Sequence, residues 1–132
     1  ASDVYKRQVY IADNSEIFID EIVKEINLCQ EKGFQSICLI CKTEKNSIYL
    51  FNKIKHKLDI QLIKNGSVSD LQGVFILPVY MSKGLEFDAV LICDADSQNY
   101  HDEDDKNLLY VACTRALHKL CLFCENEVSP LI

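Results

Sequence analysis

Four runs of consecutive apolar residues constrain the fold of this chain more than any other feature of its sequence. Such runs are typical of strands that are covered on both faces, as in a parallel sheet. They predict strands at residues 36–41, 74–78, 89–94 and 119–124. Two shorter apolar stretches predict further strands at residues 9–12 and 60–63.

The stretches between these strands carry apolar residues at three- and four-residue spacing, which predicts helices. The first helix begins at Asn14 or Ser15, either of which can cap it, and stops at Gly33. The second follows a Thr43 cap, and the third runs over residues 103–117. The predicted buried faces are Ile19, Ile22, Val23, Ile26 and Cys29 in the first helix, and Ile48, Phe51, Ile54 and Leu58 in the second.

Strands that alternate with helices predict an α/β protein, here a three-layer sandwich around a mostly parallel sheet. Ligands bind such sheets at loops beyond the carboxyl ends of the strands. We therefore expect residues 80–86, and the segment leading into the helix that carries Arg115, to lie at that edge. Residues 9–132 form one predicted domain. Residues 1–8 have mixed charge and no strong periodicity, so we interpret them as a disordered leader or cloning scar.

Composition narrows the classes of function. The chain has 132 residues and a formal net charge of −6, so any contact with nucleic acid has to be a local site. No apolar run approaches the length of a membrane span, and no secretory leader is recognisable. We therefore expect a cytoplasmic protein with no membrane partner.

Seven cysteines, including two CxxC pairs, raise the alternative of a zinc site. Cys38 and Cys41 form one pair, and Cys121 and Cys124 form the other. Both pairs lie in predicted strands, where residues three apart point to opposite faces. We interpret these cysteines as small buried side chains in a reducing compartment and predict no metal site. The carboxylates between residues 94 and 105 raise the alternative of a divalent metal site. A solvated loop, whose later carboxylates favour a helix N-terminus, explains them better.

The stretch MSKGLEF, residues 81–87, holds the first candidate site. Ser82 and backbone N–H groups can hold a phosphate oxygen, and Lys83 adds a positive charge. Gly84 permits close approach of the backbone, and Glu86 can accept a hydrogen bond from a sugar hydroxyl. An exposed β-turn would show the same composition. The sequence contains no GxxxxGK[ST] motif, so it has no phosphate-binding loop of that kind.

The stretch NLLYVACTRA, residues 107–116, holds the second candidate. Arg115 follows an apolar helical stripe that includes Leu108, Val111 and Ala112. Arginine makes bidentate contacts with phosphate and can stabilise charge in phosphoryl transfer. Taken alone, an arginine at this position would equally fit a solvated surface or an ion pair.

Together, SKGLEFDAV and LLYVACTRA resemble motifs V and VI of superfamily 1 helicases of the UvrD/Rep type. The resemblance implies a second RecA-like domain, a P-loop NTPase fold without its own P-loop. It implies that an N-terminal RecA-like domain of the same protein binds ATP with Mg²⁺. The whole protein would then be an ATP-dependent DNA helicase or translocase that acts on single-stranded DNA, and this part alone would be inactive.

The resemblance also implies roles for single residues. Arg115 matches the arginine that reaches the γ-phosphate of ATP. Glu86 matches the glutamate that contacts the nucleotide sugar, and Gly84 matches the glycine whose backbone lies near the phosphates.

Nucleic-acid contacts and supporting residues follow from the same match. Tyr80, Ser82 and Lys83 fall where motif V also faces the single strand, although the tyrosine replaces a histidine common in UvrD. Tyr110 and Thr114 flank the arginine and are expected to support it.

The spacing leaves two alternatives open. Only residues 43–73 separate the strand at 36–41 from the strand that leads into motif V, which leaves no room for the large helical insertion of UvrD and Rep. This compact form resembles the HelD/DNA helicase IV-like group, whose members in Gram-positive bacteria act on RNA polymerase without unwinding DNA. A non-enzymatic binding module is the other alternative.

Overall fold

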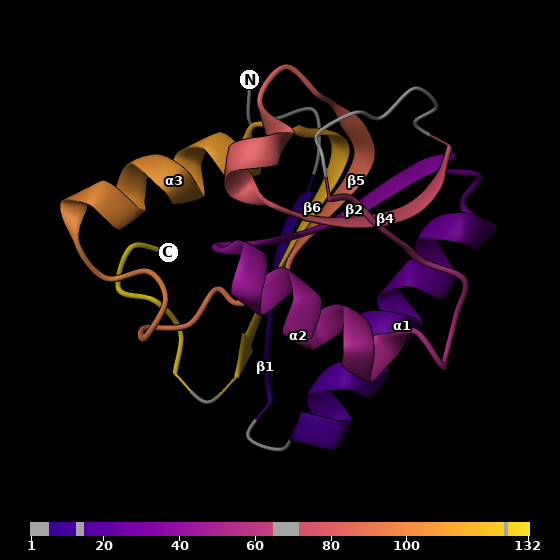
Figure 1. The fold of residues 1–132 in the computed structure, drawn as a ribbon, viewed down its shortest axis with the longest axis horizontal. Helices are drawn as coiled ribbons and strands as arrows, with labels where there is room; N and C mark the ends of the chain where they lie inside the picture. The colour runs from indigo at the N-terminus through magenta and orange to yellow at the C-terminus, as the bar shows by residue number, and fades with distance from the viewer. Residues whose placement is uncertain (1–5, 13–14, 65–71, 126) are drawn as a thin grey trace.

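The computed structural model describes residues 6–12, 15–64, 72–125 and 127–132, in which strands and helices alternate (Figure 1). The elements are β1 (Lys6–Ala12), α1 (Ser15–Glu31), β2 (Ser36–Cys41), α2 (Glu44–Ile54), β3 (Gln61–Leu62), β4 (Gly73–Pro78), the 3-10 helix η2 (Val79–Ser82), β5 (Phe87–Ile92), α3 (Glu103–Cys113) and β6 (Ala116–Glu125). No helix in these ranges has the length and apolar character needed to cross a bilayer.

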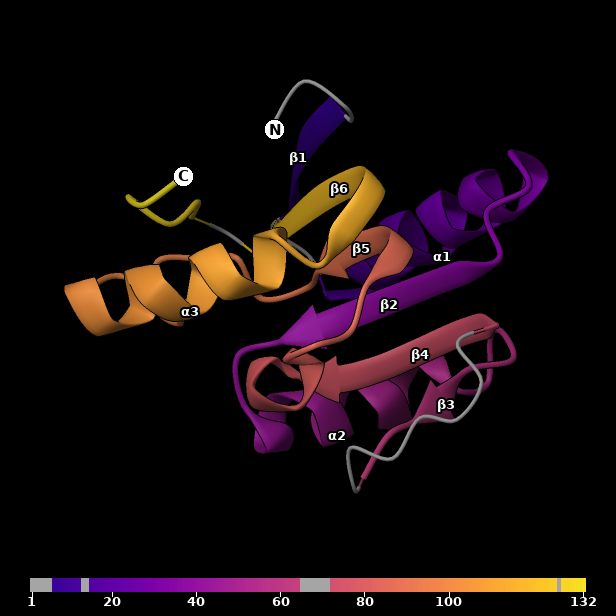
Figure 2. The same cartoon turned by 90° about the horizontal axis from the view of Figure 1, so that it is seen from above.

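The strands form one sheet in the order β1-β6-β5-β2-β4-β3, and every neighbouring pair is parallel. Parallel neighbours need crossover connections, which α1, α2 and α3 provide. Figure 2 shows α1 and α2 against one face of the sheet and α3 against the other. The predicted three-layer α/β sandwich is therefore confirmed.

Each face of the sheet has its own apolar core, because the central strands are buried on both sides. Side chains of α1 and α2 pack on one face, with Leu39, Leu91 and Phe123. Side chains of α3 and η2 pack on the other face, with Phe75 and Val90. The cysteine pairs follow the same alternation: Cys41 and Cys121 lie in the first core, and Cys38 and Cys124 lie in the second.

A buried ion pair joins β6 to α1 inside the first core. Lys119 Nζ lies 2.8 Å from Glu25 Oε2, and the two side chains are only 9% and 2% exposed. The Tyr10 hydroxyl of β1 donates a hydrogen bond of 2.8 Å to the other Glu25 oxygen. Burial acts to raise the pKa of Glu25, but the hydrogen bonds from Lys119 and Tyr10 outweigh it and lower that pKa. A charged network therefore ties together three elements that are distant in sequence.

Several predicted boundaries were wrong. The third helix ends at Cys113 and not at residue 117, because Ala116 already pairs with Phe87 and begins β6. Residues 6–8, predicted as disordered, are the first part of β1, because the parallel ladder with β6 extends over them. Residues 1–5 and the turn predicted at residues 65 and 66 lie outside the described part of the chain.

The buried face of α2 also differs from the prediction. Ser47, Leu50 and Ile54 are buried, whereas Ile48 is 41% exposed. The Thr43 side chain accepts a hydrogen bond from Asn46 N and caps the helix as predicted. The buried Ser47 hydroxyl donates to Thr43 O, so a polar residue fits the inner face at no cost in unpaired groups.

The connection between β4 and β5 sets the position of the first candidate motif. β4 ends at Pro78, after which η2 packs into the second core through Val79. The chain thus passes across the face that α3 covers and enters β5 at its amino end, Phe87. The prediction that residues 80–86 lie at the carboxyl edge is therefore wrong for the end of this stretch, because Glu86 directly precedes the amino end of β5.

Candidate functional site

A tight turn follows η2. Leu85 N donates to Ser82 O at 3.0 Å, which closes a four-residue turn. Lys83 has φ −60° and ψ 131°, and Gly84 has φ +77°. These angles define a type II turn, whose third position favours glycine because L side chains rarely adopt a positive φ there. No atom of the described residues lies within 4 Å of where a Cβ on Gly84 would be, so this side of the turn is open.

Arg115 lies between α3 and β6. Its Nε donates to Val111 O at 3.1 Å, and its Nη2 donates to Thr114 Oγ1 at 3.2 Å. The guanidinium is therefore folded back on the carboxyl end of α3. Its side chain is only partly exposed.

The turn and Arg115 contact each other directly. Arg115 Nη1 donates to Ser82 O at 3.5 Å, and Phe87 N donates to Arg115 O at 2.9 Å. Glu86 directly precedes β5 and Arg115 directly precedes β6, so both lie at the amino edge of two neighbouring strands. The two sequence motifs therefore converge at one rim of the sheet.

This rim presents groups that a ligand could reach. Lys83, Gly84 and Glu86 are exposed in the turn. Beside them lies a guanidinium whose longest contact, to Ser82 O, is at the limit of hydrogen-bond distance. Lys83, Arg115, Glu86 and the open backbone turn therefore form a set that can bind an anionic ligand with hydroxyl groups.

Two predicted site residues have surroundings that differ from the prediction. The Ser82 side chain is fully buried and its hydroxyl donates to Val79 O, so the prediction that it faces a nucleic acid is wrong. The Tyr110 side chain is 71% exposed, and only its carbonyl supports the end of α3, by accepting from Thr114 N. The Thr114 side chain does contact Arg115.

Tyr80 lies toward the opposite edge. Its side chain is 55% exposed, and its hydroxyl donates to Glu44 Oε2 at 3.1 Å. Glu44 is the first residue of α2, just beyond the carboxyl end of β2. The segment from Tyr80 to Glu86 therefore extends from near the carboxyl edge of the sheet to the amino edge.

Sequence reasoning missed Asp88, which holds the amino edge together. Its Oδ2 accepts from Gln35 N at 2.8 Å and Ser36 N at 3.2 Å, and its own N–H donates to Ser36 Oγ. These bonds tie the start of β5 to the start of β2. An acidic residue directly after the motif was the only signal for this role, and it is too common to be specific.

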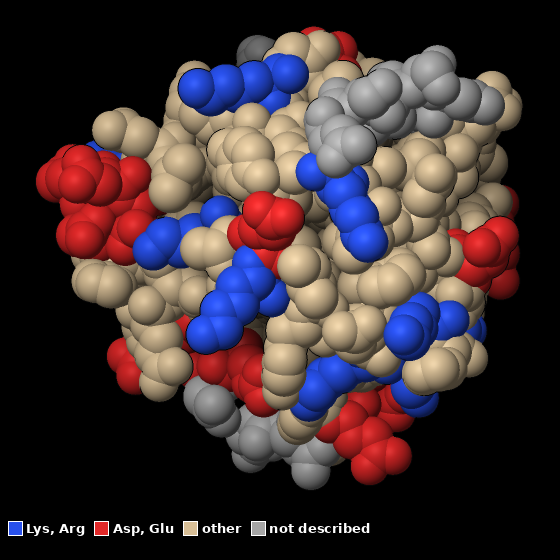
Figure 3. Space-filling view, in the orientation of Figure 1, with Lys and Arg blue, Asp and Glu red and all other residues tan. Residues whose placement is uncertain are grey.

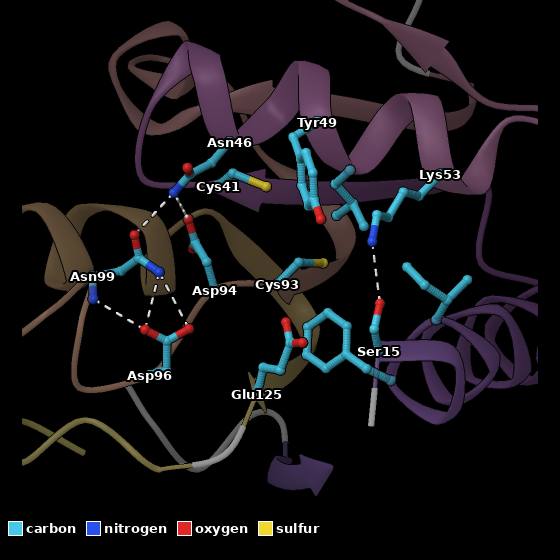
Figure 4. Close-up of a pocket in the computed structure, with 13 residues that line it drawn as sticks. Ser15, Cys41, Asn46, Tyr49, Lys53, Cys93, Asp94, Asp96, Asn99 and Glu125 are labelled. Atoms are coloured by element: carbon cyan, nitrogen blue, oxygen red, sulfur yellow. Dashed lines mark hydrogen bonds between the residues drawn. The ribbon is translucent and has the colours of Figure 1, made fainter. Parts of the chain in front are cut away.

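A polar network lies at the carboxyl edge, beside a pocket of about 160 Å³ (Figure 4). Asn46 Nδ2 donates to Asp94 Oδ2 and to Asn99 Oδ1, and Asn99 donates to Asp96. Burial raises the pKa of Asp94 to about 6, although the Lys42 N–H, at 2.8 Å, counteracts this. The network binds the β2–α2 connection to the segment after β5.

Lys42 and Asp105 form a close ion pair at this same edge. Lys42 Nζ lies 2.6 Å from Asp105 Oδ1. The hydrogen bond from Lys42 lowers the pKa of Asp105 to about 2. The Asp105 side chain also accepts from the Asp102 N–H in the capping box of α3.

The later carboxylates of the acidic run therefore stabilise a helix N-terminus, as predicted, but the prediction of a solvated loop is wrong for Asp94 and Asp105, which are buried. His101, Asp102 and Asp105 have potential ligand atoms within 4.8 Å of one another. Both Asp105 oxygens are already paired, one with Lys42 and one with backbone N–H groups. Charges of both signs are intermixed on the face seen in Figure 3, with acidic side chains gathered at the amino end of α3.

A family model described as UvrD-like helicase C-terminal domain matches residues 73–123 of the sequence. No curated protein sequence matches the chain significantly. The fold is similar to the C-terminal domain of a possible DNA helicase from Lactobacillus plantarum WCFS1, with a TM-score of 0.86 and 30% identity; the match covers 95% of this chain and 77% of that one.

Two more distant structures share the fold. The C-terminal domain of the DEAD-box protein Dbp5 has a TM-score of 0.67 and 13% identity, over 96% of this chain and 79% of that one. The arterivirus nonstructural protein 10 helicase, in a complex with DNA, has a TM-score of 0.54 and 15% identity, over 94% of this chain and 31% of that one.

Proposed function

Because the chain belongs to the UvrD-like helicase C-terminal domain family, we propose that this helicase motor domain completes an ATP site held by another domain. The other domain would be an N-terminal RecA-like domain of the same protein. The whole protein would be an ATP-dependent DNA helicase or translocase.

The convergence of the type II turn and Arg115 carries this proposal. Hydrolysis of ATP is accelerated by positive charge at the γ-phosphate, because negative charge develops as the bond between the γ-phosphorus and the leaving ADP breaks. The Arg115 guanidinium supplies such a charge from a rim that also exposes Glu86 for a sugar hydroxyl. The open side of Gly84 allows a phosphate to approach the backbone.

The Arg115 side chain has to turn away from the end of α3 to reach a nucleotide. The contacts that hold it back are those of Nε with Val111 O at 3.1 Å, of Nη2 with Thr114 Oγ1 at 3.2 Å and of Nη1 with Ser82 O at 3.5 Å. Phosphate oxygens form stronger, charge-assisted hydrogen bonds than these neutral oxygens do. Binding of the other domain with its ATP would therefore extend the side chain across the interface.

Mg²⁺ accompanies ATP in such reactions. Within the described ranges, the turn residues and Arg115 supply one carboxylate at this rim, that of Glu86, and the potential metal-ligand cluster at His101 lies at the other end of α3. The turn residues and Arg115 therefore do not fit a metal site.

Single-stranded nucleic acid is the proposed second ligand. Tyr80 is exposed near the carboxyl edge, where an aromatic ring can stack on a base. The same short segment continues into the turn beside Arg115. Movement of this segment would couple the state of the nucleotide to the affinity for single-stranded nucleic acid. Lys83 lies in the turn itself and can contribute charge to either ligand.

Two measurements test the division of labour between the domains. Titration of the isolated chain with ATP should show weak or no binding, whereas the complete protein should bind ATP tightly. Glu86→Gln in the complete protein should raise the KM for ATP severalfold, with Glu127→Gln, a distant exposed carboxylate, as the control. Tight ATP binding by the isolated chain would contradict the proposal.

A polymerase-remodelling ATPase remains the second candidate. The observation that favours it is the compact connection between β2 and β4, in which the described residues form only α2 and the short strand β3. Capture of RNA polymerase subunits by the complete protein, without separation of a tailed duplex, would support this candidate. Strand separation without such capture would support the helicase.

A further inference from the structure

We propose that Lys42 is a positioning residue for Arg115 and acts through Asp105 and α3. This inference rests on the proposed function of Arg115. Neither Lys42 nor Asp105 belongs to the rim that is proposed to face the nucleotide. Lys42 lies at the carboxyl edge of the sheet, and α3 carries its effect to the amino edge.

The ion pair joins α3 to the most constrained part of the sheet. Lys42 directly follows β2, a central strand, and its backbone N–H donates to the buried Asp94 at 2.8 Å. Its ammonium lies 2.6 Å from Asp105 Oδ1 and 5.9 Å from the ring centre of the fully buried Tyr100. The side chains of Lys42 and Asp105 are 22% and 7% exposed, so the pair is largely shielded from solvent.

The apolar contacts of α3 are confined to its carboxyl-terminal half. Of its eleven residues, only Asp105, Leu109 and Ala112 are buried. Leu108, Val111 and Cys113 pack against the core while remaining partly exposed. The pair with Lys42 and the capping box fix the first turn of this helix, whereas its apolar contacts begin only at Leu108.

Arg115 moves with the other end of this helix. Its backbone N–H donates to Ala112 O, and its Nε donates to Val111 O. A tilt of α3 about its carboxyl end therefore changes the origin and direction of the guanidinium. Misplacement of a catalytic group by about 1 Å can lower a rate by about 100-fold. Loss of the ion pair should thus reduce catalysis without removing any group that touches ATP.

The experiment uses the complete protein and three substitutions at the pair. Lys42→Met removes the ammonium, and Lys42→Arg restores a cation. Asp105→Asn removes the negative charge but keeps an oxygen that can accept from the N–H groups of His101 and Asp102, so the cap persists. Lys57→Met is the matched control, because Lys57 forms an exposed ion pair with Asp20 on the opposite face.

We expect Lys42→Met and Asp105→Asn to lower the kcat of ATP hydrolysis by roughly 10- to 100-fold. The KM for ATP should change by less than about twofold, because the nucleotide is bound mainly by the other domain. Lys42→Arg should recover most of the kcat, and Lys57→Met should leave it unchanged. Circular dichroism of the 132-residue chain at the assay temperature identifies any variant that has unfolded.

A double-mutant cycle with Arg115→Ala separates positioning from a general loss of stability. If Lys42 acts through Arg115, Lys42→Met should lower kcat no further in the Arg115→Ala background. An equal loss in both backgrounds, or an unchanged kcat in Lys42→Met, would overturn the inference. If Arg115→Ala itself leaves kcat unchanged, the proposed function fails instead.

Discussion

At the scale of single residues, the geometry of the turn before β5 depends on Gly84. Its φ of +77° is one that only glycine adopts without strain. No described neighbour would clash with an added methyl group, so the cost of a substitution lies in the backbone alone. This turn also places Ser82 O beside the Arg115 guanidinium.

Gly84→Ala should therefore destabilise the domain by about 1 kcal/mol and also slow ATP hydrolysis by the complete protein. Gly33→Ala is the matched control, since Gly33 has φ +87° and equally open surroundings but lies at the end of α1. Urea unfolding should show similar losses for both variants, and only Gly84→Ala should lower turnover. Equal turnover in the two variants would count against a role of the turn in catalysis.

At the scale of elements, buried polar contacts join segments that the apolar pattern leaves unconnected. Asp94 links the end of β5 to the β2–α2 connection, and one of its carboxylate oxygens has no partner. The nearby Tyr100 hydroxyl makes no hydrogen bond of normal geometry, and burial, followed by the interaction with Asp94, raises the pKa of Tyr100. The charged form of Asp94 is therefore costly in the folded state.

This cost predicts a pH dependence of stability. The folded-state pKa of Asp94, about 6, lies above the usual value of 3.8, so the folded protein binds a proton that the unfolded chain releases. The stabilisation of the folded state by this proton on Asp94 is fully present below about pH 4 and is lost as the pH rises through 6. Relative to wild type, Asp94→Asn should gain up to about 3 kcal/mol between pH 4 and pH 7.5.

Urea titrations of wild type and variant at both pH values measure this difference. Asp59→Asn, an exposed carboxylate, is the control and should show no such gain. A stability difference between Asp94→Asn and wild type that stays constant with pH would contradict the assignment of the cost to Asp94.

At the scale of the whole molecule, the layers follow from features that are local in sequence. The continuous apolar runs could only be satisfied between two layers of helices, which is what the structure shows. The two motifs carried the family resemblance because each keeps its residues within one short stretch.

Non-local features could not be predicted in this way. The pairing of Lys119 with Glu25 joins residues 94 apart, and nothing near either residue indicates a partner. The edge at which Glu86 lies was predicted wrongly, because the stretch that returns the chain from η2 to the start of β5 has no periodic pattern. The position of Tyr80 near α2 has the same origin.

The central claim is that Arg115 stabilises charge on an ATP molecule held by another domain. Single-turnover cleavage of ATP by the complete protein in excess tests this most directly, because it separates chemistry from binding and product release. The account predicts that Arg115→Ala binds ATP as wild type does but cleaves it about 10³-fold more slowly or worse. Cleavage of bound ATP at the wild-type rate by Arg115→Ala would contradict it.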